Sequence, residues 1–212
     1  MNYTKPMEMT APYNYANKYN MDYKWRERKT DSYIFMSGVR LPCSDLKNGA
    51  LKTSIDPKDY DLIFHSNAKP EEFLKYGVLH TNASCCFLLR QDLVEVLNEF
   101  CPDDFQAFPV MIVPEKPKKQ GEFENHDYFL INVTHKLDVF DHQNCDFSYF
   151  VYDPTKPSGV KRMVLRDASC LQGHHMVREK TLLSHVFVSP EFVALFTKLK
   201  VKGCHFRKDA EG

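Results

Sequence analysis

The stretch FLLRQDLVEVLNEF, residues 87–100, largely decides the fold, because its pattern returns in VFVSPEFVALFTKL, residues 186–199. Each stretch opens with apolar residues typical of a short strand and continues with apolar residues at helical spacing. A second apolar segment follows each predicted helix, at 105–113 and at 204–206. Both copies therefore predict a strand, an amphipathic helix and another strand.

The apolar positions of the two predicted helices coincide when the stretches are aligned. We expect both apolar faces to pack in a core, because their residues recur at intervals of three and four. Two equivalent structural units and a chance match are both compatible with this repetition. The faces consist of Leu93, Val96, Leu97 and Phe100 in the first helix and of Phe192, Leu195, Phe196 and Leu199 in the second.

The rest of the sequence predicts mostly strands. Helices and strands do not alternate as a doubly wound sheet requires, so the pattern favours an α+β fold. We expect a mainly antiparallel or mixed sheet with two principal amphipathic helices packed on it. Further strands are expected at 33–36, 61–64, 128–133, 147–152 and 161–165, a short helix at 70–77 and a turn at 153–159.

Residues 1–30 differ from the remainder, which suggests a division into an extension, 1–30, and a single α+β domain, 31–212. The extension is polar, yet it contains five tyrosines and the only tryptophan, Trp25. It is too polar to form a core alone and too aromatic for a typical disordered tail. We expect it to drape over the domain with some tyrosines docked; a free tail, or one ordered by a partner, is the alternative.

Composition excludes several classes of protein. The 28 basic residues balance the 28 acidic ones, so no overall charge favours nucleic acid or a membrane as a partner. No apolar run approaches the ~20 residues of a membrane helix, and the N-terminus lacks the apolar core of a signal peptide. Seven cysteines form an odd set without regular spacing, which favours reduced thiols and a cytoplasmic protein.

From about Asp31 onward, the sequence resembles a bacterial immunity-protein family of polymorphic toxin systems, long catalogued as a domain of unknown function. The order and spacing of four segments together carry the resemblance. Their apolar positions taken singly are ones that many cores share. The segments are 88–97 with 105–110, 127–141, 164–167 with 175–178, and 186–192 with 203–206.

The resemblance implies that the protein neutralises a cognate toxin by direct binding, and it supplies no catalytic residues. From the residues themselves, Trp25, Arg166, His175 and Arg178 are candidate partner contacts. Aromatic rings give contact area at low entropic cost, and arginine makes planar, bidentate contacts with carboxylates. For Arg166 and Arg178 the alternative is a surface ion pair with Asp167 or Glu179, which contributes little.

Two catalytic or metal-binding arrangements compete weakly with this interpretation. His142 and Cys145 have the spacing of half a zinc site, which His174, His175 or Cys170 would complete. Because a zinc signature needs two properly spaced pairs, we expect no metal site and no cofactor. A second arrangement is a thiol nucleophile, Cys85 or Cys86, activated by His135 or His175 with Asp138 or Asp141. Buried structural cysteines are the simpler interpretation, so we expect no catalytic residue.

The leading hypothesis is therefore a cytoplasmic, non-enzymatic immunity protein that binds and occludes a bacterial toxin, without nucleic-acid or membrane partners. A Cys/His-dependent enzyme of unknown substrate is the first alternative. A structural protein that forms homo-oligomers is the second.

Overall fold

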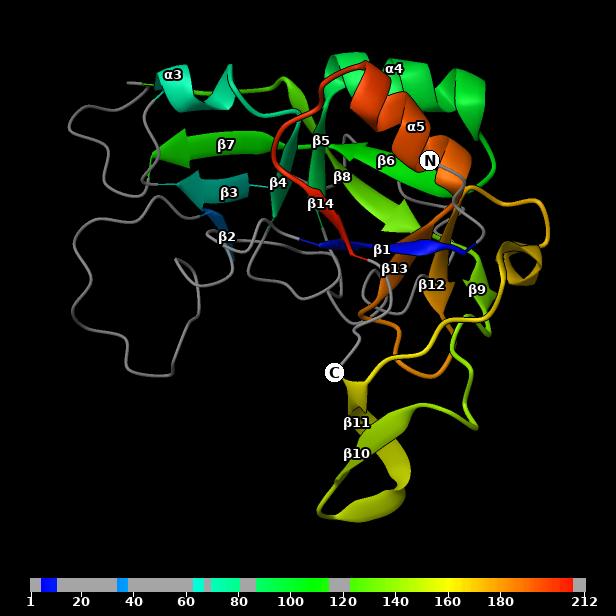
Figure 1. The fold of residues 1–212 in the computed structure, drawn as a ribbon. Helices are drawn as coiled ribbons and strands as arrows, with labels where there is room; N and C mark the ends of the chain where they lie inside the picture. Colours follow the sequence, from blue (N-terminus) through cyan, green and yellow to red (C-terminus); the bar gives the residue numbers. More distant parts are fainter. Residues whose placement is uncertain are drawn as a thin grey trace.

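The computed structural model describes residues 5–10, 34–37, 63–66, 70–80, 87–114 and 123–207. Within these ranges the chain forms fourteen strands in four sheets, which contain five, four, three and two strands. Figure 1 shows the helices gathered along one side of the sheets and a hairpin projecting from the opposite side. The strands are β1 Met7–Thr10, β2 Ile34–Ser37, β3 Ile63–Ser66, β4 Val78–His80, β5 Phe87–Arg90, β6 Phe105–Pro109, β7 Met111–Pro114, β8 Tyr128–Val133, β9 Lys136–Leu137, β10 Asp146–Phe150, β11 Asp153–Arg162, β12 Met176–Glu179, β13 Val186–Val188 and β14 His205–Arg207.

The fold is mainly β, so the expected α+β class is wrong. Among the described residues only two helices exceed one turn, α4 (Gln91–Phe100) and α5 (Pro190–Lys198). The other helical segments are α3 (Pro70–Phe73) and the 3₁₀ helix η2 (Ala168–Leu171). The two long helices lie where the sequence predicts them. The error came from the many short strands around them, which form several separate sheets instead of one sheet that supports the helices.

The two predicted strand–helix–strand units are both present and have the same topology. In the first unit β8 lies between β5 and β6 and is antiparallel to both strands. In the second unit β1 lies between β13 and β14 and is likewise antiparallel to both. Each helix therefore joins two parallel strands that are separated by one antiparallel strand from elsewhere in the chain.

The N-terminal strand β1 is thus an interior strand of the five-stranded sheet, whose order is β14-β1-β13-β12-β9. Met7 and Met9 are buried in the same core as both helices. Part of the predicted N-terminal extension therefore belongs to the sheet. The alternation of Met7, Glu8, Met9 and Thr10 is a strand signal. Surrounding polar residues obscured it in the sequence.

The helices bury corresponding positions, which extends the likeness between the two units to their packing. Leu93, Val94 and Leu97 are buried in α4, and their aligned counterparts Phe192, Val193 and Phe196 are buried in α5. All six belong to one core cluster that also contains residues of β1 and β8. Leu199, expected in this face, is instead 42% exposed because α5 ends at Lys198.

Gly203 holds the second unit close to the first. Its φ is +106°, and a Cβ atom at this position would lie 1.9 Å from the carbonyl oxygen of Val78. Beside it, the carbonyl oxygen of Lys202 accepts hydrogen bonds from the backbone N–H groups of Gly77 and Val78. Glycine permits both the positive φ and this approach of two backbones.

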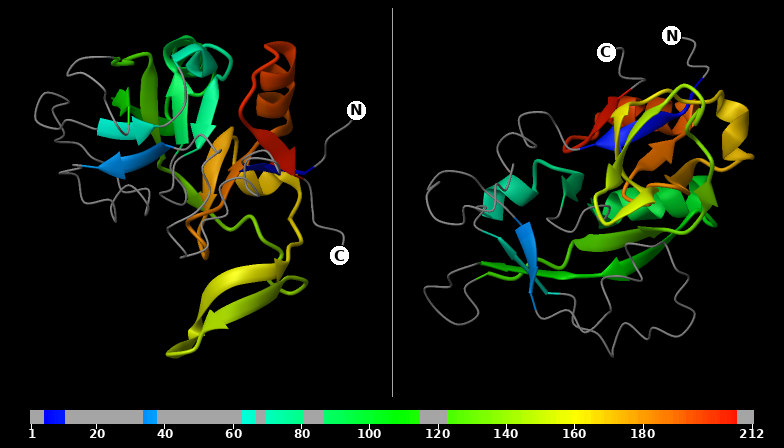
Figure 2. Two further views of the ribbon diagram at one scale, coloured as in Figure 1. Left: turned by 90° about the vertical axis from the view of Figure 1, so that its left-hand side faces the viewer. Right: turned by 90° about the horizontal axis from the view of Figure 1, so that it is seen from below.

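The projecting hairpin consists of β10 and β11, joined by Val151 and Tyr152. The whole segment 153–159, predicted as a turn, is in fact part of strand β11, although it contains two prolines. Proline is tolerated there because β11 has a single partner, and register shifts interrupt the pairing. Figure 2 shows that this hairpin, the arm, extends away from the body of the molecule.

Candidate functional site

A group of interacting polar side chains lies where the four-stranded and five-stranded sheets meet. After β8 leaves the first sheet, the chain passes through Thr134 and His135 into β9 of the second. Arg178 of β12 spans this junction and is fully buried. Its side chain donates hydrogen bonds of 2.9 Å to the carbonyl oxygens of Val133 and Leu183. The guanidinium group thus satisfies backbone acceptors on both sides of the junction.

At the same junction, the carboxylate of Asp104 accepts hydrogen bonds from backbone N–H groups. It lies in the turn between α4 and β6 and is 4% exposed. Its Oδ2 atom accepts hydrogen bonds from the backbone N–H groups of His175 (2.6 Å) and Met176 (3.0 Å). A buried carboxylate that satisfies buried N–H groups is more stable than one without partners. Asp104 therefore fixes the start of β12 against the end of α4.

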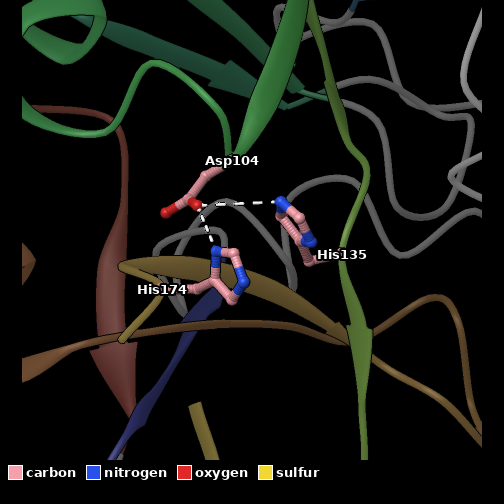
Figure 3. Close-up of side chains that lie close together, drawn as sticks. All are labelled: Asp104, His135 and His174. Carbon is pink, nitrogen blue, oxygen red and sulfur yellow. Dashed lines mark hydrogen bonds and ion pairs between the residues drawn. The ribbon is translucent and has the colours of Figure 1, made fainter. Parts of the chain in front are cut away.

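Two histidines complete this cluster, as Figure 3 shows. The Nδ1–H group of His174 donates to Oδ1 of Asp104 over 2.7 Å. His135 approaches the same oxygen to 4.0 Å and donates its Nε2–H to the carbonyl oxygen of Asp103 over 2.9 Å. The two imidazole rings stack with their centroids 3.7 Å apart. We name Asp104, His135 and His174 the junction cluster.

The junction cluster has residue types that suit a metal ion, and its potential ligand atoms lie within 4.8 Å of one another. Its hydrogen bonds nevertheless oppose metal binding. The nitrogens of His135 and His174 that face Asp104 both act as donors, and three N–H groups already share the carboxylate. A metal ion at this point would displace the hydrogen bonds that His135 and His174 donate from the same nitrogens. The geometry therefore favours a structural cluster over a metal centre.

A second group, Asp138, His142 and Glu179, has a similar design. Glu179 is fully buried, and its carboxylate accepts backbone N–H bonds from Val139, Phe140 and Thr181 at 2.8–3.0 Å. The Nε2 atom of His142 lies 3.8 Å from Glu179 and 4.0 Å from Asp138. As in the junction cluster, backbone donors occupy the buried carboxylate.

The four predicted partner contacts are not gathered in one place. Arg178 is buried at the junction, and its side chain binds backbone carbonyl groups. His175 is half-buried, with its ring 4.2 Å from that of Phe100 and its Nδ1 atom 2.8 Å from Oγ of Ser189. Arg166 is exposed and donates to the carbonyl oxygen of Asp138. Trp25 lies outside the described residues.

The cysteines of the described ranges are free thiols, and burial lowers their reactivity. Burial raises the pKa of Cys101 and of Cys204 to about 12 and that of Cys170 to about 11. Such groups remain protonated at neutral pH and are poor nucleophiles. The proposed nucleophiles Cys85 and Cys86 lie outside the described residues. Of the candidate zinc ligands considered in the sequence, His142 and His174 belong to separate clusters.

Sequence analysis missed Glu8, which anchors β1 within its sheet. Glu8 is 6% exposed, and its carboxylate accepts from Nδ1 of His185 at 2.5 Å and from Arg207 at 2.6 Å. Burial by itself raises the pKa of Glu8, but the hydrogen bonds and charges of His185 and Arg207 together hold it below its usual range. A single glutamate within a polar segment gave no signal for this role.

None of the helices in the described ranges is long and apolar enough to cross a membrane. Comparison with curated proteins finds no significant match. A model of the immunity protein family Imm11 matches residues 23–211, nearly the whole chain, and β1 lies before the matched region. This chain is therefore a member of the immunity protein family Imm11.

Proposed function

We propose that this protein neutralises a cognate bacterial toxin of a polymorphic toxin system by binding it and covering its active site, in the cytoplasm of the producing cell. The observation that carries the proposal is the family match across residues 23–211. An immunity function implies a toxin as the partner, and occlusion is the mechanism that requires no catalytic group of this chain. The raised pKa values of the buried thiols also accord with a role that does not depend on a nucleophile.

Exposed residues are the source of partner contacts in this proposal. Arg166 is available at the surface and is retained as a contact. His175 is half-buried, and its ring contacts Phe100 and Ser189. Arg178 acts indirectly by holding the junction together, because exposing its side chain would break hydrogen bonds to two buried carbonyl groups.

The first test is protection. The toxin domain encoded next to this gene is expressed in a host with and without the protein, and growth is scored. We expect the protein to restore growth. Cys85→Ser, Cys86→Ser and His175→Ala variants should still protect once their folding has been verified. Failure of the wild-type protein to protect would contradict the proposal.

The second test separates occlusion from catalysis. Purified protein is titrated into a fixed concentration of active toxin, and the remaining toxin activity is measured after increasing times. An occluding inhibitor acts stoichiometrically, so inhibition should end at one equivalent and should not deepen with time. Complete inactivation by a small fraction of an equivalent would instead identify an enzyme that modifies the toxin or its product.

Arg178→Ala and removal of residues 1–30 are unsuitable for mapping the binding surface. The first change leaves buried acceptors at the junction, and the second removes β1 from the interior of a sheet. Either variant would lose protection through misfolding. Arg166→Ala is the informative change, because its side chain is exposed.

A further inference from the structure

Exposed apolar side chains are concentrated at the tip of the arm. Five large apolar side chains of the described residues are strongly exposed, and three of them fall within residues 149–152. Tyr149 is 49%, Tyr152 80% and Val151 fully exposed. The ring of Phe150 lies 5.0 Å from that of Tyr152, so these two rings form one aromatic surface. A contiguous apolar patch on a soluble protein marks an interaction site more often than scattered apolar residues do.

The base of the arm is firmly attached to the body. Phe147 packs against Phe140 and His142, with ring centroids 5.8 Å and 5.4 Å away. The backbone N–H of Asp141 donates to the carbonyl oxygen of Val164 at 2.8 Å, and Arg162 donates to the carbonyl oxygen of Asn144 at 2.8 Å. The arm therefore presents its apolar tip on a fixed support, so binding through the tip requires no rearrangement of the base.

The charges of the arm indicate the surface that it fits. Asp146 stands opposite Arg162 in the strand pairing, and Thr155 hydrogen bonds the carboxylate of Asp153. The hydrogen bond from Thr155 leaves the Asp153 carboxylate charged, so Asp146 and Asp153 against Lys156, Lys161 and Arg162 give the arm a net charge of +1. A weakly cationic arm gains no electrostatic attraction from a cationic groove of the kind that binds nucleic acid. Its charge complements a cleft with an acidic rim.

We propose that the β10–β11 arm is the element that anchors this protein to its toxin, by inserting Tyr149, Val151 and Tyr152 into an apolar cleft with an acidic rim. The inference rests on the proposed toxin-binding function and identifies the part of this protein that contacts the toxin. A projecting hairpin buries its tip only in a concave partner, and aromatic anchors in a desolvated pocket supply most of the affinity of many interfaces.

The test compares the loss of apolar side chains at the tip of the arm with the loss of one exposed apolar side chain elsewhere on the surface. One variant carries Tyr149→Ser, Val151→Ser and Tyr152→Ser; a second carries Val151→Ser alone, whose fully exposed side chain has no packing to lose. The matched control is Leu74→Ser, which removes a side chain 74% exposed near α3. Binding to a catalytically inactivated form of the adjacent toxin domain is measured for each variant by calorimetry, after circular dichroism has verified folding.

We expect the triple variant to lose at least ~100-fold in affinity, Val151→Ser several-fold, and Leu74→Ser nothing measurable. Charge reversal by Lys156→Glu with Lys161→Glu should slow association about tenfold at low salt and less at high salt. A photo-crosslinking amino acid in place of Val151 should capture the toxin, whereas the same group in place of exposed Ser158 should do so more weakly.

Tip variants that bind as tightly as the wild-type protein would overturn the inference while leaving the proposed function intact. Equal losses for the tip and Leu74 variants would also overturn it, because affinity would then not depend on the arm. A wild-type dimer that the triple substitution converts to monomers would assign the arm to self-association instead. If the wild-type protein itself fails to bind the toxin, the inference and the proposed function both fall.

Discussion

At the scale of single residues, buried charged side chains act on the backbone in this protein. Arg178 binds carbonyl groups, while Asp104 and Glu179 bind N–H groups, all within the core. Sequence patterns assign such residues to the surface, because unpaired charges are almost never fully buried. Arg178 therefore gave the signal of a contact residue although it lies inside. The stabilising effect of these three buried side chains depends on backbone partners that only the folded chain provides.

Asp104→Ala should destabilise the protein by about 3 kcal/mol, because buried N–H groups of His175 and Met176 would lose their acceptor. The neighbouring exposed Asp103→Ala is the control and should change the free energy of unfolding by no more than ~0.5 kcal/mol. Urea denaturation of both variants measures the difference. Similar midpoints would contradict the role assigned to Asp104.

His80 should make the protein sensitive to mild acid. Burial lowers the pKa of His80 to about 4, and among the described residues its Nε2 atom has no hydrogen-bond partner. The pKa of His80 in the folded state lies below its unfolded value of ~6.5, so the folded protein favours the neutral ring. The free energy of unfolding therefore has its full value above pH ~6.5 and decreases as the pH falls toward 4. The loss should reach about 3 kcal/mol.

Thermal unfolding measured between pH 7 and pH 4 tests this expectation. His80→Phe should flatten the pH dependence in that window, whereas substitution of exposed His126 by Gln should leave it unchanged. The lowered pKa of Glu8 also reduces stability in acid, but at lower pH. Its contribution to the free energy of unfolding is present above the ordinary carboxyl pKa and is lost as the pH falls below that range. If the thermal midpoint of the His80→Phe variant depends on pH as strongly as that of the wild-type protein, His80 is not the source of the acid sensitivity.

At the scale of elements, the two helices were predictable and their sheets were not. Spacings of three and four identify α4 and α5 directly from the sequence, because each helix packs one apolar face. The partners of a strand depend on distant residues, so no local pattern places β1 between β13 and β14 or β8 between β5 and β6. For the same reason the four-sheet arrangement escaped prediction, and β11 was mistaken for a turn.

Phe196 tests the phase of α5. Phe196→Ala should cost about 3–5 kcal/mol, because the side chain is 2% exposed and its loss leaves a cavity in the shared core. Lys198→Ala on the exposed side should cost no more than ~0.5 kcal/mol. The two variants are compared by denaturant unfolding. Equal midpoints would show that the helix faces are wrongly assigned.

Met9 tests whether β1 belongs to the stable fold. Met9→Asp places a carboxylate in the core beside α4 and α5 and should destabilise the protein by at least ~3 kcal/mol. Met9→Leu keeps the volume and the apolar character, so it should cost less than ~1.5 kcal/mol. Thermal midpoints of the pair provide the measurement. A harmless Met9→Asp would place β1 outside the cooperative unit.

At the scale of the whole molecule, the candidate sites are distributed over distinct regions. The junction cluster stabilises the meeting of two sheets, and the arm projects from the body. The sequence indicated the family, but it gave no signal that the arm projects from the body. Its aromatic residues have the pattern of an ordinary strand, and only the structure shows that they lack cover. Arg166, four residues beyond the arm, is the predicted contact nearest to it along the chain.

Metal content can be tested on the intact protein. We expect reduced thiols and no stoichiometric zinc, because hydrogen bonds engage the histidines and carboxylate of the junction cluster and no paired zinc motif occurs. Elemental analysis after purification without chelators, with thiol titration under denaturing conditions, checks both. One zinc ion per chain, lost in a His174→Ala or Cys145→Ser variant, would show the opposite.

The interior position of β1 also governs the order in which the protein can assemble during its synthesis. The carboxylate of Glu8 binds Arg207, which lies 199 residues later in the chain. A ribosome therefore releases β1 long before either of its neighbours exists. The five-stranded sheet can close only after β14 has emerged, whereas the four-stranded sheet is complete once β8 has been made. Until then β1 lacks both of its neighbouring strands, so its apolar face is buried only by long-range contacts that form late in folding.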